Sequence, residues 1–142
     1  MIRPAKLTDL PRLCELAVLM HDESPFPLPP IDADKLIVGL MRATVIVWEQ
    51  NDLVGGFIAL QEGAFWYSQE KFIADLLFYV QPEYRKSTAG KDLIRAAQSY
   101  AKIKELPLFM APVNGVDVDR KDALYKRLGM RKLGGTYSYG LG

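Results

Sequence analysis

The sequence predicts a single α/β domain over residues 1–142, with a mixed (α+β) β-sheet flanked by helices on both faces. The spacing of apolar residues alternates along the chain between the helical period and the strand period. Residues 72–80 form a near-continuous apolar run, which predicts a central strand buried on both faces. The 142-residue chain has no repeat, and its one proline-rich stretch, residues 25–30, is too short to join two domains.

The first third of the sequence predicts a short strand followed by two helices. The strand candidate is residues 1–5. Thr8 is expected to cap a helix over residues 9–21, where apolar side chains recur at helical spacing. Asp32 or Asp34 is expected to cap a second, shorter helix.

The middle of the sequence predicts three strands. Residues 44–49 and 53–60 are rich in β-branched and apolar side chains and flank a polar turn, which predicts a hairpin. The strand at residues 72–80 follows, and Pro82 ends it because proline donates no hydrogen bond to a strand ladder.

The last third returns to helical spacing over residues 89–105. A strand at residues 108–113 follows, and then a helix that begins near Asp119 and stops at Gly129. Residues 136–139 are the candidate for a last strand. The predicted order is therefore β-α-α-β-β-β-α-β-α-β.

Composition excludes several classes of protein. The formal net charge of +1 gives no reason to expect a nucleic-acid partner. Cys14 is the only cysteine, so no intramolecular disulfide can form, and it lies on the apolar face of the first predicted helix. The N-terminus lacks the apolar core of a signal peptide, and no stretch reaches the roughly 18 apolar residues of a membrane span. We therefore expect a cytoplasmic protein without a membrane partner.

The junction between the strand at residues 72–80 and the following helix has the pattern of an anion site. A helix N-terminus presents free N–H groups and the positive end of the helix dipole. A bound diphosphate fits this pattern, and so does a basic, solvated turn. The small residues at the junction are Ser87, Thr88, Ala89 and Gly90, and its positive charges come from Arg85, Lys86 and Lys91.

Three stretches of the chain resemble one known family. Residues 80–93 resemble the acetyl-CoA-binding motif of the GNAT superfamily of N-acetyltransferases, with Val-x-Pro-Glu-Tyr-Arg at the strand end and a glycine at position 90. Residues 123–131, which contain Leu-Tyr-Lys-Arg-Leu-Gly, resemble a second segment of that family, and residues 2–10 resemble its usual start. The resemblance spans nearly the whole chain. It implies the acyl-CoA N-acyltransferase fold and transfer of an acetyl (acyl) group from acetyl-CoA to a primary amine by direct attack.

The same resemblance implies how the acyl donor is held. The backbone of Phe78, Tyr79 and Val80 would pair with the pantetheine arm, and the pyrophosphate would lie on residues 85–90. Asn114 resembles an asparagine that often contacts the cofactor. Thr88 replaces the first glycine of the family loop, and a β-branched residue disfavours a positive φ and adds bulk near the phosphates. The alternative is that its hydroxyl donates to a phosphate oxygen, so cofactor binding is expected to be either weakened or rearranged.

Acylation requires a neutral amine, so a group that accepts a proton is expected. Asp75 is the only acid in the strand at residues 72–80, and it occupies the place where several family members carry a glutamate base. Flanking apolar residues would raise its pKa by desolvation. The alternative is a carboxylate at a strand edge that pairs with a basic neighbour. Glu62 and Glu70 are reserve candidates.

The resemblance places Tyr125 where the family carries a tyrosine that donates to the departing thiolate. A core aromatic on the last helix is an alternative compatible with that role. His21 is the only histidine, which excludes a histidine-pair metal site, and no metal is expected.

The acceptor amine is not identifiable from the sequence. In the family the acceptor site is built from regions that correspond here to residues 25–30 and 61–70. The aromatic residues 65–67 are candidates for an acceptor pocket, for a subunit contact in a homodimer, or for a cover over the core. A competing hypothesis is a catalytically degenerate protein that keeps the fold for binding or assembly.

Overall fold

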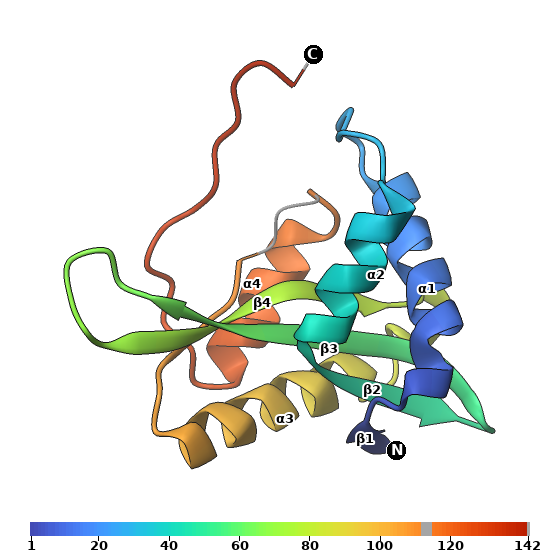
Figure 1. The fold of residues 1–142 in the computed structure, drawn as a ribbon, viewed down its shortest axis with the longest axis horizontal. Helices are drawn as coiled ribbons and strands as arrows, with labels where there is room; N and C mark the ends of the chain where they lie inside the picture. Colours follow the sequence, from blue (N-terminus) through green and yellow to red (C-terminus); the bar gives the residue numbers. More distant parts are fainter. Residues whose placement is uncertain (112–114, 142) are drawn as a thin grey trace.

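A five-stranded mixed sheet forms the centre of the protein in a computed structural model that describes residues 1–111 and 115–141 (Figure 1). The strands lie in sequence order, and neighbours from β1 to β4 are antiparallel, while β4 and β5 are parallel. The change of direction makes room for a helical crossover between β4 and β5. The strands are β1 (Ile2–Pro4), β2 (Thr44–Gln50), β3 (Leu53–Ala64), β4 (Lys71–Val80) and β5 (Leu108–Phe109).

Helices cover both faces of the sheet, as the sequence predicts (Figure 1). Two helices pack on one face and α3 packs on the other, while α4 lies beside β4. Short 3₁₀ turns at Leu7–Asp9 and Pro82–Tyr84 precede α1 and α3. The helices are α1 (Leu10–Glu23), α2 (Ala33–Arg42), α3 (Ala89–Lys104) and α4 (Val118–Arg127).

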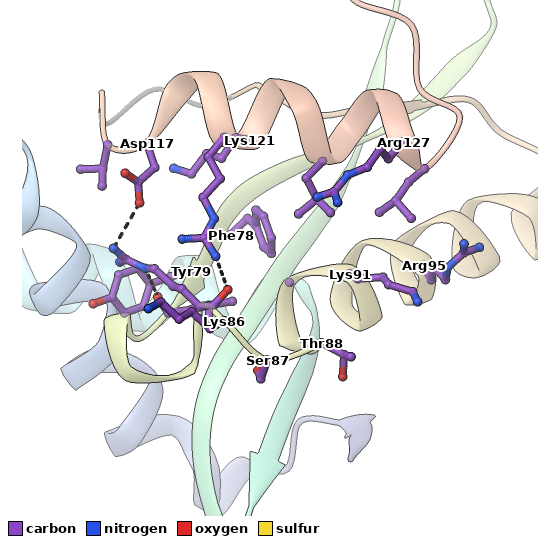
Figure 2. A pocket seen from close by; sticks show the side chains of 17 residues that line it. Phe78, Tyr79, Lys86, Ser87, Thr88, Lys91, Arg95, Asp117, Lys121 and Arg127 are labelled. Atoms are coloured by element: carbon purple, nitrogen blue, oxygen red, sulfur yellow. Dashed lines mark hydrogen bonds and ion pairs between the residues drawn. The ribbon is translucent and has the colours of Figure 1, made fainter.

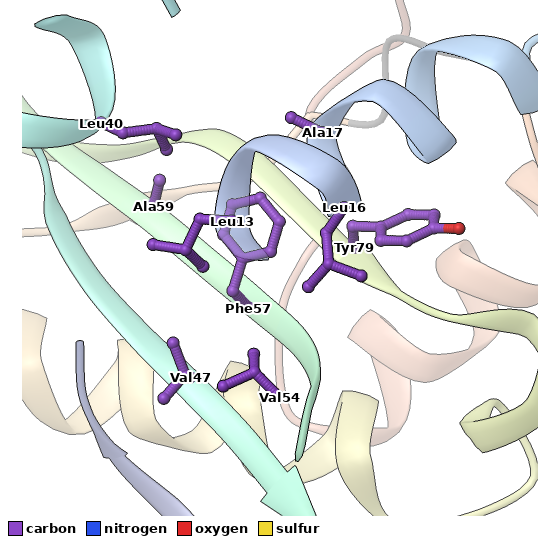
Figure 3. Close-up of a cluster of buried hydrophobic side chains, with 9 residues drawn as sticks. All are labelled: Leu13, Leu16, Ala17, Leu40, Val47, Val54, Phe57, Ala59 and Tyr79. Atoms are coloured by element: carbon purple, nitrogen blue, oxygen red, sulfur yellow. The ribbon is translucent and has the colours of Figure 1, made fainter. Parts of the chain in front are cut away.

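The two faces carry separate apolar clusters. On the α1 and α2 face, Leu13 and Leu16 pack against Phe57 and Tyr79 of the sheet (Figure 3). On the α3 face, Leu93 and its neighbours one and two turns along the helix pack against β3 and β4. The alternation of side chains along β3 therefore fills both clusters, and residues 54–60 are all buried.

Helix starts agree with the sequence only in part. Of the two predicted candidates, Asp32 caps α2, because its Oδ1 accepts the N–H of Lys35 at 3.0 Å. The prediction that Thr8 caps α1 is wrong, since Asp9 occupies the N-cap position without a side-chain capping bond. The Asp9 carboxylate instead binds the guanidinium of Arg3, at 2.8 and 3.0 Å. The same carboxylate also accepts the N–H of Lys6 at 2.7 Å, so Asp9 caps the 3₁₀ turn that precedes α1.

The predicted strand at residues 136–139 is wrong, because these residues have no secondary structure. Tyr137 and Tyr139 are fully or almost fully exposed, at 95% and 104%. Their alternation with polar residues is typical of a strand. A strand also needs a free sheet edge to pair with, and the sequence pattern does not show whether one exists. In the described chain β5 has only two residues, so it offers little ladder to extend.

A bulge divides β4. Ala59 of β3 pairs with Leu77 and the next residue, Leu60, pairs with Asp75, so Leu76 is the extra residue. Leu76 is 40% exposed, and the expectation that the strand is buried on both faces holds only in part. Before the bulge, β5 pairs with β4 at two positions that end at Ala74. No strand in the described residues pairs with that edge beyond the bulge.

The β3–β4 hairpin projects from the sheet and ends in aromatic residues (Figure 1). Trp66 at its tip is 94% exposed. Trp48 of β2 is only 5% exposed, and its ring centroid lies 5.1 Å from that of Tyr84. None of the described helices has the length and apolar character needed to cross a membrane.

Candidate functional site

A cavity of about 530 Å³ lies where the end of β4, the following loop and α4 meet (Figure 2). Phe78, Tyr79 and Val80 line it from β4, and the predicted anion loop lines it from below. Its volume lies within the usual range for ligand pockets. The structure thus brings most of the predicted cofactor residues to one place.

The cavity is strongly basic. Among the described residues of its wall, Asp117 is the one acidic residue, against seven cationic residues. Four of them extend the basic surface along α3 and α4 beyond the loop that the sequence singled out. The seven are Arg85, Lys86, Lys91, Arg95, Arg120, Lys121 and Arg127.

The loop before α3 is held by its own small side chains. Ser87 Oγ donates to the carbonyl of Tyr84 at 2.5 Å and accepts the N–H of Ala89 at 3.1 Å. The ring of Tyr84 packs over Gly55 of β3, where an added Cβ would lie 2.5 Å from the ring. Ala89 is fully buried and supports the loop from beneath, while Ser87, Thr88 and Gly90 line the cavity.

Thr88 fits the loop without backbone strain. It occupies the N-cap position of α3 with φ −82°, so the expected conflict with a positive φ is wrong. Its hydroxyl donates to Asp92 Oδ2 at 2.8 Å. The replacement of the family glycine is therefore compatible with an open loop.

Arg85 lines the cavity but is bound by the protein itself. Its Nη2 donates to Glu23 Oε2 at 2.6 Å, its Nε donates to the carbonyl of Val80 at 2.9 Å, and its Nη1 lies 3.6 Å from Asp117 Oδ2. Tyr79 Oη donates to the other oxygen of Glu23 at 2.5 Å. Burial and this carboxylate raise the pKa of the Tyr79 hydroxyl. Arg85 thus joins the end of α1, the end of β4 and the start of α4.

The edge of β4 beside the cavity has unpaired backbone groups. Gln81 N–H donates to Gly55 O on the β3 side, at 2.9 Å. Alternate residues of a strand point to opposite edges, so Phe78 and Val80 face away from β3. The bond from Arg85 to the Val80 carbonyl lies on that outer edge. In the described residues, the N–H and C=O of Phe78 and the N–H of Val80 have no strand partner there.

Asp75 lies just before the bulge and outside the wall of this cavity. Its Oδ1 accepts the N–H of Ala111 at 3.1 Å. Desolvation raises the pKa of the Asp75 carboxyl, and the Ala111 N–H and the charge of Lys121 oppose the rise. The carboxyl is therefore a stronger base than an exposed aspartate.

Tyr125 is 9% exposed and lines a second cavity of about 770 Å³, bounded by β5, α4 and the C-terminal segment. Burial and the nearby charge of Asp75 raise the pKa of its hydroxyl, so Tyr125 stays protonated at neutral pH. Lys121, one turn earlier on α4, lines the first cavity. Desolvation lowers the pKa of Lys121. One face of α4 thus borders both cavities.

Several site residues escaped the sequence analysis. Lys121 was detectable, because it precedes Tyr125 by four residues on a predicted helix. Glu23 and Asp117 are brought to Arg85 from distant segments, so no local pattern marks them. Of the other candidates, Glu62 and Glu70 are exposed on the β3–β4 hairpin, and Asn114 lies outside the described residues.

Comparison with known proteins identifies the family. The model of the acetyltransferase (GNAT) family matches residues 10–130. Curated proteins give no significant match. Solved structures share the fold over nearly their whole length, although sequence identity is low.

One similar structure is an aminoglycoside acetyltransferase from an uncultured soil metagenomic sample, with 20% identity, a TM-score of 0.74, and coverage of 100% of this chain and 96% of that chain. Another is a ribosomal-protein-alanine N-acetyltransferase from Brucella melitensis, with 16% identity, a TM-score of 0.72 and 99% coverage of both chains. A GNAT family acetyltransferase from Staphylococcus aureus has 15% identity, a TM-score of 0.69, and coverage of 99% and 98%. By the match of the family model over most of its length, the chain belongs to the acetyltransferase (GNAT) family and is an acetyl-CoA-dependent N-acetyltransferase.

Proposed function

We propose that the basic cavity beside β4 binds acetyl-CoA and that the acetyl group is transferred directly to a primary amine near the bulge of β4. One observation carries this proposal: a wall of seven cationic residues leads onto a strand edge with unpaired backbone groups. A chain of phosphates followed by an amide-containing arm matches those two features in the same order.

The fit of coenzyme A is supported by the chemistry of the wall. The loop of residues 85–91 offers N–H groups at the start of α3 together with the positive helix end. Lys86 has no acidic partner in the described chain, so its charge is available to a phosphate. The N–H and C=O of Phe78 and the N–H of Val80 would bind the pantetheine amides, as an added strand would.

Bound acetyl-CoA supplies an activated acetyl thioester. The protein contributes position, because alignment along β4 holds the thioester where an amine can attack it. Asp75 would accept the proton of the attacking amine, directly or through water, with its pKa raised by burial. Tyr125, which stays protonated, would donate to the departing thiolate sulfur. The charge of Asp75 acts on both Tyr125 and Lys121, so the two proposed groups lie close to each other beside α4.

The acceptor would reach the thioester past the proline-rich loop and the β3–β4 hairpin. The loop is tied to α1, because His21 Nε2 lies 2.7 Å from the carbonyl oxygen of Pro29. Phe26 of the loop is 52% exposed, and Trp66 at the hairpin tip is 94% exposed. The structural relatives include enzymes named for aminoglycosides and for the alanine of a ribosomal protein, so both kinds of amine are reasonable first acceptors.

Two measurements test the proposal. Calorimetry with acetyl-CoA is expected to show binding at micromolar concentration. Release of free thiol is then followed with a panel of aminoglycosides and of peptides with an N-terminal alanine. Absence of binding at millimolar acetyl-CoA would contradict the assigned cavity. Binding without thiol release above the protein-free background for any amine would favour a protein that only binds the ligand.

A further inference from the structure

The basic wall of the cavity separates into two groups of side chains. Figure 2 shows Lys86 near Tyr79, whereas Lys91 and Arg95 lie on α3 toward the other end of the cavity, with Arg127 across from them on α4. Lys91 and Arg95 are one turn apart on α3, so they share a face of that helix. Arg127 approaches from the last residue of α4. We call these three residues the distal basic cluster.

Among the residues that the structure describes, the distal basic cluster has no ion-pair partner. None of its three members forms a hydrogen bond, ion pair or ring contact in the described part of the chain. Arg85 differs, because Glu23 and Asp117 neutralise it. The charge of the cluster is therefore available to a ligand.

The placement of the cluster is also unfavourable without an anion. Two like charges at positions i and i+4 of a helix repel each other. Lys91 is the third residue of α3, where the helix dipole disfavours a cation. Arg127 brings a third positive charge to the same wall. An anionic group bound among the three would relieve each of these repulsions.

The chemistry of coenzyme A supplies such a group. The molecule carries a pyrophosphate and, separated from it by the ribose, a 3′-phosphate monoester. The pyrophosphate accounts for the loop before α3 and leaves the distal basic cluster unexplained. A phosphate monoester carries more negative charge than a phosphate that is esterified twice. It also binds arginine through paired hydrogen bonds.

We propose that Lys91, Arg95 and Arg127 bind the 3′-phosphate of coenzyme A and make the enzyme select acetyl-CoA over its 3′-dephospho form. The inference rests on the proposed function, because it assumes that the acyl donor occupies the cavity. It goes further by assigning a specificity for one end of the donor to three named residues. The pantetheine arm and the reacting thioester are the same in both ligands.

Calorimetry with CoA and with dephospho-CoA tests the proposal at low ionic strength. The wild-type protein is expected to bind CoA at least about tenfold more tightly, because charge-assisted hydrogen bonds to the 3′-phosphate are lost in the second ligand. The variant Arg95→Gln/Arg127→Gln is expected to bind both ligands with affinities within about twofold of each other. Its affinity for dephospho-CoA is expected to match that of the wild type. In the wild type, the preference for CoA should decrease as salt is added.

A matched control carries the same change of charge away from the cavity. Lys102→Gln/Lys126→Gln alters one residue on α3 and one on α4, both exposed and outside this cavity. It is expected to keep the full preference for CoA. Arg95→Lys/Arg127→Lys, which keeps the charge, should retain part of it.

The outcomes separate this inference from the proposed function. Equal affinity of the wild type for CoA and dephospho-CoA would overturn the 3′-phosphate assignment and leave acetyl-CoA binding intact. Two other results would also overturn it: a preference for CoA that survives in Arg95→Gln/Arg127→Gln, or one that falls equally in the Lys102→Gln/Lys126→Gln control. Failure of both ligands to bind would contradict the proposed function, and this inference with it.

Discussion

The two parts of β4 on either side of Leu76 differ in what surrounds them. Before the bulge the strand has partners on both edges, β3 and β5, and carries Asp75 close to Tyr125 of α4. After the bulge it pairs with β3 alone and leads into a basic loop. In the proposed function, the first part carries the groups that move protons, and the second carries the groups that bind an anionic, amide-containing ligand. If the proposed function holds, chemistry and donor binding occupy adjacent stretches of one strand, and substitutions should separate them.

The largest effect is expected from Asp75→Asn. We expect kcat to fall about 100-fold, because the amine loses its proton acceptor, while the Kd of acetyl-CoA stays within about twofold. The asparagine oxygen can still accept the N–H of Ala111, so the local fold is kept. Steady-state kinetics and calorimetry on the same preparations provide the check. A large change in Kd instead would mean that the strand is not divided in this way.

The same variant has an expected effect on stability with a defined sign. The folded-state pKa of Asp75 is raised above the ordinary value of 3.8, so the ionised carboxylate disfavours folding as pH rises through that folded pKa. Asp75→Asn is therefore expected to be more stable than the wild type near pH 7, by about 1 kcal/mol, with the difference shrinking toward pH 4. Thermal unfolding as a function of pH measures it. A variant that is less stable at neutral pH would contradict the desolvation argument.

A smaller loss of rate is expected from Tyr125→Phe. Removing a donor to the thiolate should lower kcat about 30-fold, because a hydrogen bond to a charged group is lost. The hydroxyl has no hydrogen-bond partner in the described residues, so stability should change little. The Kd of acetyl-CoA is again expected to hold. An unchanged kcat would show that Tyr125 acts only as a core aromatic and not as a donor to the thiolate.

Lys86→Gln tests the other part of the strand. This residue lines the cavity beside the loop, so the variant should weaken acetyl-CoA binding about tenfold and leave kcat at saturating donor nearly unchanged. Lys35→Gln on α2, outside both cavities, is the control with the same loss of charge. Equal effects of the two variants would show that only net charge matters.

The smallest effect is expected from Thr88→Gly, which restores the glycine of the family loop. Because Thr88 already has a negative φ, the Kd of acetyl-CoA should change by less than about twofold. Loss of the bond to Asp92 and the added backbone freedom should lower stability by up to about 1 kcal/mol. A tenfold gain in affinity would show that the threonine side chain obstructs the phosphates.

The sequence predicted what depends on local pattern. Periodicity located the helices and the four longer strands of the fold, and the motif at residues 80–93 located the basic cavity. The last strand was predicted wrongly, because alternation at residues 136–139 says nothing about an available edge. The bulge at Leu76 was also invisible, since an apolar run has the same composition with or without an extra residue.

Long-range electrostatics was the other limit. The motif at residue 85 predicts a phosphate ligand, but Glu23, 62 residues earlier, binds the same guanidinium. In the reverse direction, the sequence does not mark Arg95 or Arg127 as a ligand-binding residue, and only the packing of α3 and α4 brings them to one wall. Charges from distant segments therefore decided which cations are available to a ligand.

The contact of Trp48 with Tyr84 provides the protein with an optical probe of its own. The chain has two tryptophans, and their solvent exposure is very different: Trp48 is 5% exposed and Trp66 is 94% exposed. Indole emission responds to the polarity and motion of its surroundings. Tyr84, which packs on Trp48, also holds Ser87 of the donor loop. In a Trp66→Phe protein the tryptophan emission would come from Trp48 alone. Because Trp48 contacts Tyr84, and Tyr84 contacts the loop, donor binding is expected to change this emission and can be followed without a label.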